Sequence, residues 1–149
     1  MDYTVFTTPP PHFASSMEAA GCYCEYQGRI LFLKRPAHKT QGNRWGMPAG
    51  KVEPGEDPKS AVLREIYEEI GVRLDHLTVH PISTLFIRLE NMDYTYYSFH
   101  ALFTEAPSLI LCEDECAEAR WMSCQEALEL PLVFGGIEAL NLFQKFRNE

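Results

Sequence analysis

Residues 50–72 read GKVEPGEDPKSAVLREIYEEIGV, and the second half of this stretch carries the signals of a complete α-helix. Asp57 belongs to the residue types that cap helix N-termini with their side chains, and Pro58 suits the first helical position. Gly71 suits the left-handed backbone position that often follows the last helical turn. The stretch therefore predicts a helix over residues 58–70.

Three glutamates share one side of this predicted helix. Glu68 and Glu69 lie three and four residues after Glu65, so the three carboxylates occupy an arc of about 100°. Like charges this close repel by roughly 0.2–0.5 kcal/mol per pair on a solvated surface. A divalent cation such as Mg²⁺, which binds carboxylate and phosphate oxygens, would reverse that cost. The helix alone fits either a metal site or an ordinary solvated acidic face.

The opposite side of the predicted helix is apolar. Its residues are Val62, Leu63, Ile66, Tyr67 and Ile70. Because an amphipathic helix packs its apolar stripe against the core, we expect these side chains to be packed and the three glutamates to face outward. Arg64 lies one turn before Glu68 and can form a salt bridge with it.

The loop before the helix adds further fixed positions to the pattern of glutamates. Gly50, Pro54 and Gly55 bracket a turn, and Glu56 precedes the helix cap. Residues 50–72 satisfy G-x5-E-x7-R-E-U-x-E-E-x-G-U, where U is aliphatic, at every fixed position. This is the Nudix box, and the chain resembles the Nudix hydrolase family. The preceding WGMPAG is similar to the family's W-x-x-P-G-G lead-in and departs from it at Ala49.

The resemblance implies a metal-dependent hydrolase that cleaves a pyrophosphate bond in a nucleoside diphosphate linked to another group. Mg²⁺ is the implied cofactor, and Mn²⁺ can substitute for it. By the resemblance, Glu65, Glu68 and Glu69 bind the metal, and the Gly50 carbonyl is an added ligand. Arg64 is implied to orient the glutamates. Metal ions suit this chemistry because they neutralise phosphate oxygens and lower the pKa of bound water.

The sequence contains two candidates for the general base. Acidic residues cluster before a predicted strand over 119–122, at Glu113, Asp114, Glu115 and Glu118. Glu115 stands about where relatives often carry a distal glutamate that binds metal or acts as base, and Glu118 is the second candidate. A solvated acidic loop without a catalytic role explains the same residues.

Basic residues lie just ahead of the acidic helix, at Lys34, Arg35, His38, Lys39, Arg44 and Lys51. Arg35, Arg44 and Lys51 are the candidates for substrate phosphates, with a solvated basic loop as the alternative. Trp45, next to the box, is the first candidate to stack on a base. Three further aromatic residues could do the same but more often form sheet core, namely Phe86, Tyr94 and Tyr96.

Composition indicates one domain that acts on a small molecule. The chain has 149 residues, of which 46% are hydrophobic, and a net charge of −8. This acidity argues against a polymeric nucleic acid as partner. The sequence has no apolar stretch near the length of a membrane span and no signal-peptide pattern. The five cysteines are an odd number, which we interpret as free thiols in the cytoplasm.

The coarse order of elements predicts an α/β chain of the α+β type. We expect strands over 17–26 and 29–35, within 77–89, over 94–103 and over 119–122, with a capped helix from Ser123 and a final helix over 137–147. Residues 36–55 are expected to form a long loop. By the resemblance, these elements form a mixed sheet between helices. We expect residues 1–16 to be an N-terminal arm and 17–149 one Nudix domain.

The sequence lacks residues that mark two substrate classes of the family. The proline typical of relatives acting on ADP-ribose is replaced by Ile87, and the tyrosine typical of diadenosine polyphosphate relatives by residues 88–90. A (d)NTP or modified NTP, cleaved to NMP and pyrophosphate, remains the expected substrate. The alternatives are an idle nucleotide-binding or sensor module and a hydrolase of a non-nucleotide diphosphate. A homodimer through exposed aromatic residues of the sheet is left open.

Overall fold

The sheet includes a β-hairpin near the N-terminus. The computed structural model describes residues 2–148, so Met1 and Glu149, the outer ends of the predicted arm and domain, lie outside the described residues. Strands Ser15–Tyr26 (β2) and Arg29–Lys34 (β3) pair antiparallel around Gln27 and Gly28. Both turn residues have positive φ, 51° and 78°, which matches the twist of a two-residue hairpin.

The sheet is mixed, as predicted. Strand β2 pairs in parallel with β7, β7 pairs antiparallel with β6, and β1 forms the edge beyond β6. On the other side, β3 pairs with β4 and β8, while β5 pairs with β2. The remaining strands are β1 (Tyr3–Phe6), β4 (Trp45–Gly46), β5 (Ala49–Lys51), β6 (Val79–Leu89), β7 (Asp93–Phe103) and β8 (Glu118–Met122).

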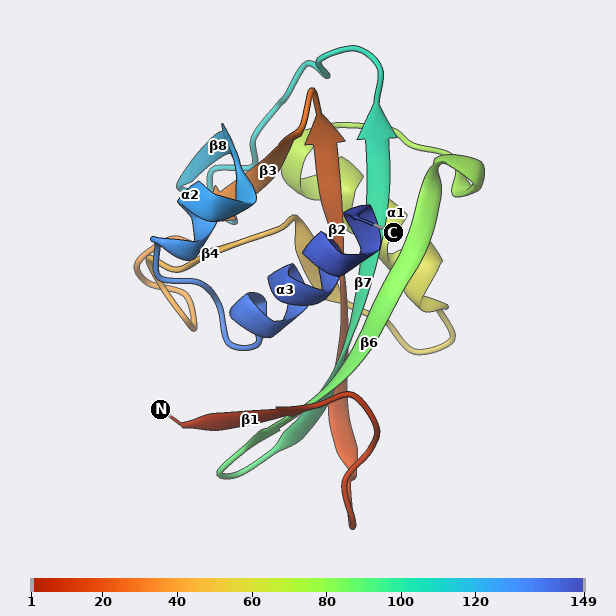
Figure 1. The fold of residues 1–149 in the computed structure, drawn as a ribbon, viewed down its shortest axis with the longest axis vertical. Helices are drawn as coiled ribbons and strands as arrows, with labels where there is room; N and C mark the ends of the chain where they lie inside the picture. The colour runs from red at the N-terminus through yellow and green to blue at the C-terminus, as the bar shows by residue number, and fades with distance from the viewer. Residues whose placement is uncertain (1, 149) are drawn as a thin grey trace.

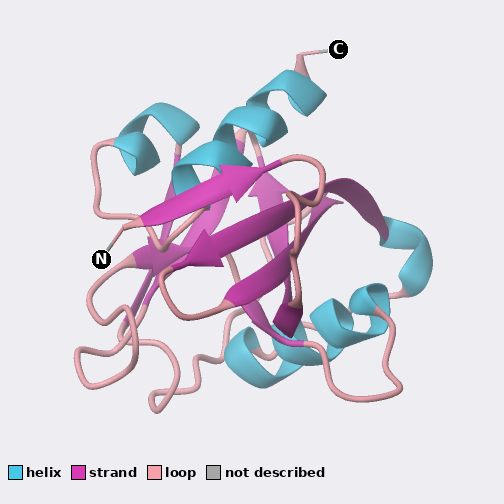
Figure 2. Ribbon diagram, turned by 90° about the horizontal axis from the view of Figure 1, so that it is seen from below, coloured by secondary structure: helices cyan, strands magenta, loops and turns pink. Residues whose placement is uncertain are grey.

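Helices cover both faces of this sheet (Figures 1 and 2). They are α1 (Pro58–Ile70), the short 3₁₀ helix η1 (His76–Thr78), α2 (Cys124–Leu128) and α3 (Gly136–Arg147). Helix α1 packs on one face, where Ile66 joins a core with Cys22 and Cys24. Helix α3 packs on the other face, where Phe143 stacks on Tyr23 with ring centroids 4.4 Å apart. Alternate residues of β2 therefore serve opposite cores.

The predicted helix boundaries in the box are confirmed. The Asp57 side chain accepts a hydrogen bond from the Ser60 N–H, and Gly71 adopts φ 71° after the last turn. The capping box that begins α2 at Ser123 is also present. The predicted loop over 36–55 is wrong in part, because the short strands β4 and β5 lie within it and bring the end of the loop onto the sheet.

Two other features bear on the expectations from sequence. The five cysteines, all within the described residues, are free thiols. Among the helices of residues 2–148, none combines the length and apolar character needed to cross a membrane. The segment ahead of β2 is ordered against the sheet, since Tyr3–Phe6 pairs along β6.

Candidate active site

Strand β5 lies directly on helix α1 at Gly50. A Cβ atom built at this position would fall 2.0 Å from the Glu65 carboxyl carbon, a separation that side chains do not reach. Any larger residue at position 50 would therefore displace the Glu65 carboxylate from its present position. The contact places the backbone of Gly50 beside Glu65, one of the three box glutamates.

Arg64 joins the loop to the helix. Its Nε and Nη2 donate to the two carboxylate oxygens of Glu56, both at 2.9 Å, and Nη2 also donates to the Lys51 carbonyl. Its Nη1 donates to Glu65 at 2.8 Å and to Glu68 at 3.3 Å. The hydrogen bonds from Arg64 lower the pKa of Glu56 to about 2. Arg64 thus orients the glutamates while Glu56 braces the loop.

Glu69 is the buried member of the acidic cluster, with 8% of the residue exposed. Its Oε1 accepts a hydrogen bond from the Ala49 N–H at 2.8 Å, and its backbone carbonyl accepts one from Cys112. Burial, and then the negative charge of Glu65, raise its pKa to about 8, although the Ala49 N–H opposes the change. Below pH 8 this carboxyl group is mostly protonated unless a cation stabilises its charge.

The expectation that all three glutamates face outward is therefore wrong for Glu69. The periodicity of the helix does not reveal that β5 and the segment around Cys112 cover this part of the acidic side. Glu65 is intermediate, with 13% of its side chain exposed, and Glu68 is outermost at 49%. Tyr67 was expected to pack but is 45% exposed, with the Arg73 guanidinium 4.0 Å from its ring centroid.

Glu115 lies close enough to this cluster to act on it electrostatically. Its charge is among the causes that raise the pKa values of Glu65 and Glu69; burial is the largest cause in both cases. The turn that carries it is fixed by hydrogen bonds from the N–H groups of Glu115 and Cys116 to the Cys112 carbonyl. The structure thus brings together Glu115 and the box glutamates, which are far apart in sequence.

Glu118, the second candidate base, is placed differently. It begins strand β8 opposite Lys34, and its Oε2 accepts a hydrogen bond from Arg120 Nε at 2.6 Å. Its carboxylate is therefore engaged with a neighbour on its own strand. The geometry favours Glu115 over Glu118 as the distal carboxylate of the site.

The donor groups fit a hard divalent cation. Carboxylates of Glu65, Glu68 and Glu69 lie along α1 beside the backbone of Gly50, and oxygen is the ligand that Mg²⁺ prefers. Across residues 2–148, no three His, Cys, Asp or Glu side chains already converge as a metal-binding group. Two of the carboxylates are turned toward Arg64 and the third toward Ala49, so metal binding requires these side chains to reorient.

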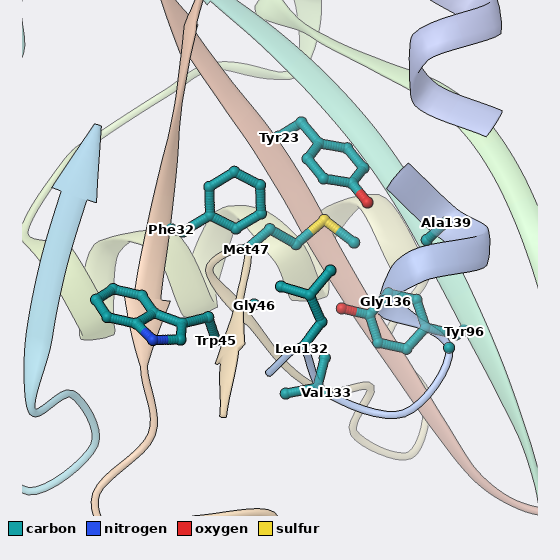
Figure 3. A pocket seen from close by; sticks show the side chains of 11 residues that line it. Tyr23, Phe32, Trp45, Gly46, Met47, Tyr96, Leu132, Val133, Gly136 and Ala139 are labelled. Atoms are coloured by element: carbon teal, nitrogen blue, oxygen red, sulfur yellow. The ribbon is translucent and has the colours of Figure 1, made fainter. Parts of the chain in front are cut away.

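A narrow apolar slot lies on the α3 side of the sheet (Figure 3). Its walls combine strands β2, β3, β4 and β7 with the segment leading into α3, through Tyr23, Phe32, Trp45, Gly46, Met47, Tyr96, Leu132, Val133, Gly135, Gly136 and Ala139. Figure 3 shows the hydroxyl ends of Tyr23 and Tyr96 turned into the slot. A Cβ at Gly21 would lie 2.8 Å from the Tyr96 hydroxyl and 3.0 Å from Ala49, so this end of the slot adjoins β5.

The charge of the acidic cluster affects the slot. Burial is the largest cause that raises the pKa of Tyr96, and the charge of Glu69 contributes in the same direction. Arg35 lowers the pKa values of both Tyr96 and Glu69 as a minor cause. The Arg35 guanidinium is therefore within electrostatic range of both the slot and the carboxylate cluster.

The four predicted substrate-binding residues divide into two groups. Arg35 is held by a hydrogen bond from its Nε to the Thr40 carbonyl at 2.7 Å, and the Lys51 side chain is exposed. Arg44 donates instead to the Leu132 carbonyl at 2.9 Å and so supports the slot wall. Trp45 is 3% exposed and forms part of the slot, with Arg120 4.9 Å from its ring centroid.

Several slot residues were not singled out from the sequence. Met47 lies within the WGMPAG lead-in, Tyr23 lies within the strand expected over 17–26, and Gly135 stands just before the expected final helix. Of the other aromatic candidates, Phe86 packs edge-on against Phe13, and Tyr94 donates its hydroxyl to the Phe134 carbonyl at 3.5 Å. Only the pairing of distant strands shows which aromatic side chains share the slot.

The NUDIX domain family matches residues 16–143, which include the box and the flanking sheet. The chain belongs to the Nudix family. It is an enzyme of the Nudix hydrolase type, and the predicted mixed sheet between helices is confirmed by the structures of relatives. The family generally uses divalent metals, which agrees with the oxygen donors on α1.

The chain is similar to the CTP pyrophosphohydrolase of Escherichia coli, with 29% identity over 136 residues that cover 88% of this chain and 93% of the relative. It is 38% identical to the 8-oxo-dGTP diphosphatase of Proteus vulgaris over 61 residues, spanning 54% of that protein. The solution structure of the E. coli ORF135 protein superposes with a TM-score of 0.75 at 26% identity, covering 94% of this chain and 96% of that one. A Caenorhabditis elegans Ap4A hydrolase, at 21% identity, a TM-score of 0.72 and coverage of 89% and 98%, shows the same fold.

Proposed function

We propose that this Nudix hydrolase cleaves a nucleoside triphosphate to the monophosphate and pyrophosphate, and that CTP or a related pyrimidine nucleotide is the first substrate to test. The observation that carries the proposal is the junction between the slot and the acidic cluster at β5, where Ala49 contacts Glu69 and Gly50 contacts Glu65. A base in the slot would place its phosphates toward the glutamates. A relative that is similar over 88% of this chain is a CTP pyrophosphohydrolase, which supports the choice.

Glu65, Glu68 and Glu69, with the Gly50 carbonyl and Glu115 as further ligands, would hold the metal ion. When bound, Mg²⁺ or Mn²⁺ would supply neutralisation of the phosphate oxygens and a lowered pKa for the attacking water. Burial raises the pKa of Glu69 to about 8 by disfavouring its charged form. A bound cation would stabilise that charge, which supports a metal site here.

The protein's own groups then have separate tasks. Glu115, whose charge acts on Glu65 and Glu69, is the proposed base that accepts a proton from the attacking water at its carboxylate. Arg64 keeps Glu65 and Glu68 oriented through the hydrogen bonds from Nη1. Arg35 is the proposed phosphate contact, because its charge already acts on Glu69. General bases of this kind need reach to the proton first and a suitable pKa second.

The slot is the proposed base site. The cavity measures about 10 Å³, room for about one water molecule, so a base would enter only after the walls move apart. The Tyr96 and Tyr23 hydroxyls would then supply polar groups that orient it. Trp45 contributes apolar wall from within the slot instead of an exposed ring for stacking. Arg44 supports this wall through the Leu132 carbonyl. Lys51, at the exposed end of β5, remains a proposed phosphate contact.

The experiment is a product assay over a panel of substrates. CTP, dCTP, the other unmodified and oxidised (d)NTPs, ADP-ribose and diadenosine polyphosphates are incubated with the protein and Mg²⁺ or Mn²⁺. The expected result is metal-dependent conversion of a triphosphate to NMP and pyrophosphate. Release of orthophosphate with NDP as the product would contradict the proposed reaction. Tight nucleotide binding without turnover would support the sensor alternative instead.

A further inference from the structure

The N-terminal strand β1 lies outside residues 16–143, the part of the chain that matches the family. It forms the edge of the sheet on β6, with Tyr3 opposite Leu89 and Val5 opposite Ile87. In Figure 1 this strand crosses the lower part of the sheet, near the chain segment that leads into α3. The strand is therefore close to the slot wall although it is remote from the box in sequence.

Tyr3 makes its side-chain contacts with that segment. Its ring stacks on Phe134, with centroids 5.3 Å apart and planes 27° from parallel. Its hydroxyl donates to Glu138 Oε1 at 3.2 Å, in the first turn of α3. Stacking fixes the plane of Phe134, and the hydrogen bond fixes the beginning of α3 relative to β1.

Val5 supports the same segment two residues further along the strand. Gly135 has φ 81°, and a Cβ built on it would lie 2.6 Å from Ile87 Cδ1 and 4.0 Å from Val5 Cγ2. The turn at Gly135 is thus pressed against the paired strands β1 and β6. Because Gly135 and Gly136 line the slot, the edge of the sheet supports the slot wall from outside.

The wall segment also contacts the loop before β4. The Phe134 N–H donates to Gln41 Oε1, and the Arg44 guanidinium lies 5.2 Å from the Phe134 ring centroid. Phe134 therefore contacts Tyr3 of β1 as well as Gln41 and Arg44 of the 36–44 loop. Loss of any of these contacts should loosen the backbone that follows Phe134 into the slot.

We propose that Tyr3 is a positioning residue for the base slot: through Phe134 and Glu138 it holds residues 132–136 in place, so that the N-terminal strand contributes to nucleotide affinity. The inference rests on the proposed function for its effect on affinity, but not for the mechanical coupling of Tyr3 to the wall. Tyr3 acts away from the glutamates, so its removal should change substrate binding more than the chemical step.

The test combines steady-state kinetics with hydrogen exchange in Tyr3→Ala, Tyr3→Phe and Thr4→Ala. Thr4 is the matched control because it lies on the same strand and is exposed. With CTP and Mg²⁺, Tyr3→Ala should raise KM about tenfold and change kcat less than about twofold. Tyr3→Phe, which keeps the ring and loses the hydrogen bond to Glu138, should raise KM about threefold. Thr4→Ala should match the wild type.

Hydrogen exchange of the nucleotide-free protein separates the two parts of the inference. Amides of residues 132–136 should exchange faster in Tyr3→Ala, while those of α1 keep their rates. Unchanged exchange at 132–136 would overturn the positioning role whatever the activity. Faster exchange with unchanged KM would overturn the claim on affinity. If the wild type turns over no nucleotide, the proposed function fails, and the exchange data still decide the coupling.

A loss of folding in Tyr3→Ala would not end the test. Tyr3→Phe keeps the packing on Phe134, and Glu138→Gln weakens the same hydrogen bond from the other side. Both variants should share the smaller rise in KM and the faster exchange near Gly135. A fall in kcat at constant KM in these variants would contradict the proposal.

Discussion

The acidic half of the site comes from one contiguous stretch, residues 50–72, apart from Glu115, whereas the slot is assembled from segments spread between Tyr23 and Ala139. In the acidic half, Arg64 connects loop and helix through direct hydrogen bonds. In the slot, the walls depend on strand pairing and on contacts with the strand β1. The acidic half therefore depends mainly on one segment of the sequence. The slot, which we propose binds the base, depends on the arrangement of the whole fold.

The two halves also differ in their electrostatics. The acidic half accumulates negative charge, and burial raises the pKa of Glu69 to about 8. The slot is apolar, and its polar groups are phenolic hydroxyls that stay protonated at neutral pH. Changes in the acidic half should therefore alter the rate and the metal affinity. Changes in the slot should alter KM and the choice of base.

Glu68→Gln tests the acidic half with the largest expected effect. The substitution removes a charge at the most exposed of the three glutamates, so the fold should be kept. We expect kcat to fall at least about 100-fold because a proposed metal ligand loses its charge. The measurement is NMP release from the triphosphate that the panel identifies.

Glu129→Gln is the matched control, since Glu129 is exposed at the end of α2. It should keep the activity of the wild type. Full activity in Glu68→Gln would remove this residue from the proposed metal site.

The difference between the halves explains what could be predicted from sequence. The caps at Asp57 and Gly71 are local signals, so the bounds of the helix were predicted correctly. The burial of Glu69 depends on the Ala49 amide and on the segment around Cys112. Helical periodicity cannot show such cover, because it describes one element at a time.

Only single residues of the slot could be predicted from sequence, because the slot forms by pairing of strands that are distant in the chain. Trp45 was a candidate because it adjoins the box, but its burial follows from pairing between β3 and β4. Tyr23 and Met47 meet Tyr96 because β2 lies between β5 and β7. The contact of Tyr3 with Phe134 joins residues 131 positions apart, and no spacing rule reaches that far.

Gly50→Ala probes the contact between β5 and α1. A Cβ atom at 2.0 Å from the Glu65 carboxyl carbon must displace that side chain. We expect the Kd for Mn²⁺ to rise at least about tenfold, with a matching loss of activity, because misplaced ligands bind metal poorly. Titration calorimetry measures the Kd directly.

Gly28→Ala provides the contrast for that experiment. Unlike Gly50, Gly28 has a positive φ, and a Cβ there meets open space among the described residues. This variant should lose about 1 kcal/mol of stability and keep the Mn²⁺ affinity. Equal Mn²⁺ affinity in both variants would show that the contact of Gly50 with Glu65 does not shape the site.

Tyr96→Phe tests the slot with a smaller effect. The substitution removes a hydroxyl that points into the slot and keeps the ring. We expect KM for the preferred nucleotide to rise about fivefold, with a smaller change for other bases, because a polar group that orients the base is lost. Tyr97→Phe is the control, since its hydroxyl bonds to Glu18 on the other face of the sheet.

Glu56→Gln should have the smallest effect, seen in stability and its pH dependence. The pKa of Glu56 is lowered to about 2 by Arg64, so its ion pair stabilises the fold above about pH 4.5 and is lost as pH falls toward 2. The variant should lose about 1 kcal/mol at pH 7 after allowance for solvent screening. The difference from wild type should shrink below pH 4.5 in urea unfolding, and the exposed Glu53→Gln should show no such trend.

The most direct test of the account is calorimetric titration of Mn²⁺ into the wild type and Glu69→Gln at pH 7, in two buffers of different protonation enthalpy. With a pKa of about 8, Glu69 is mostly protonated without metal and must lose its proton to bind. We predict release of about one proton per ion in the wild type, and at least about tenfold weaker binding without proton release in Glu69→Gln. Equal affinity and equal proton release in the two proteins would contradict the metal site on α1.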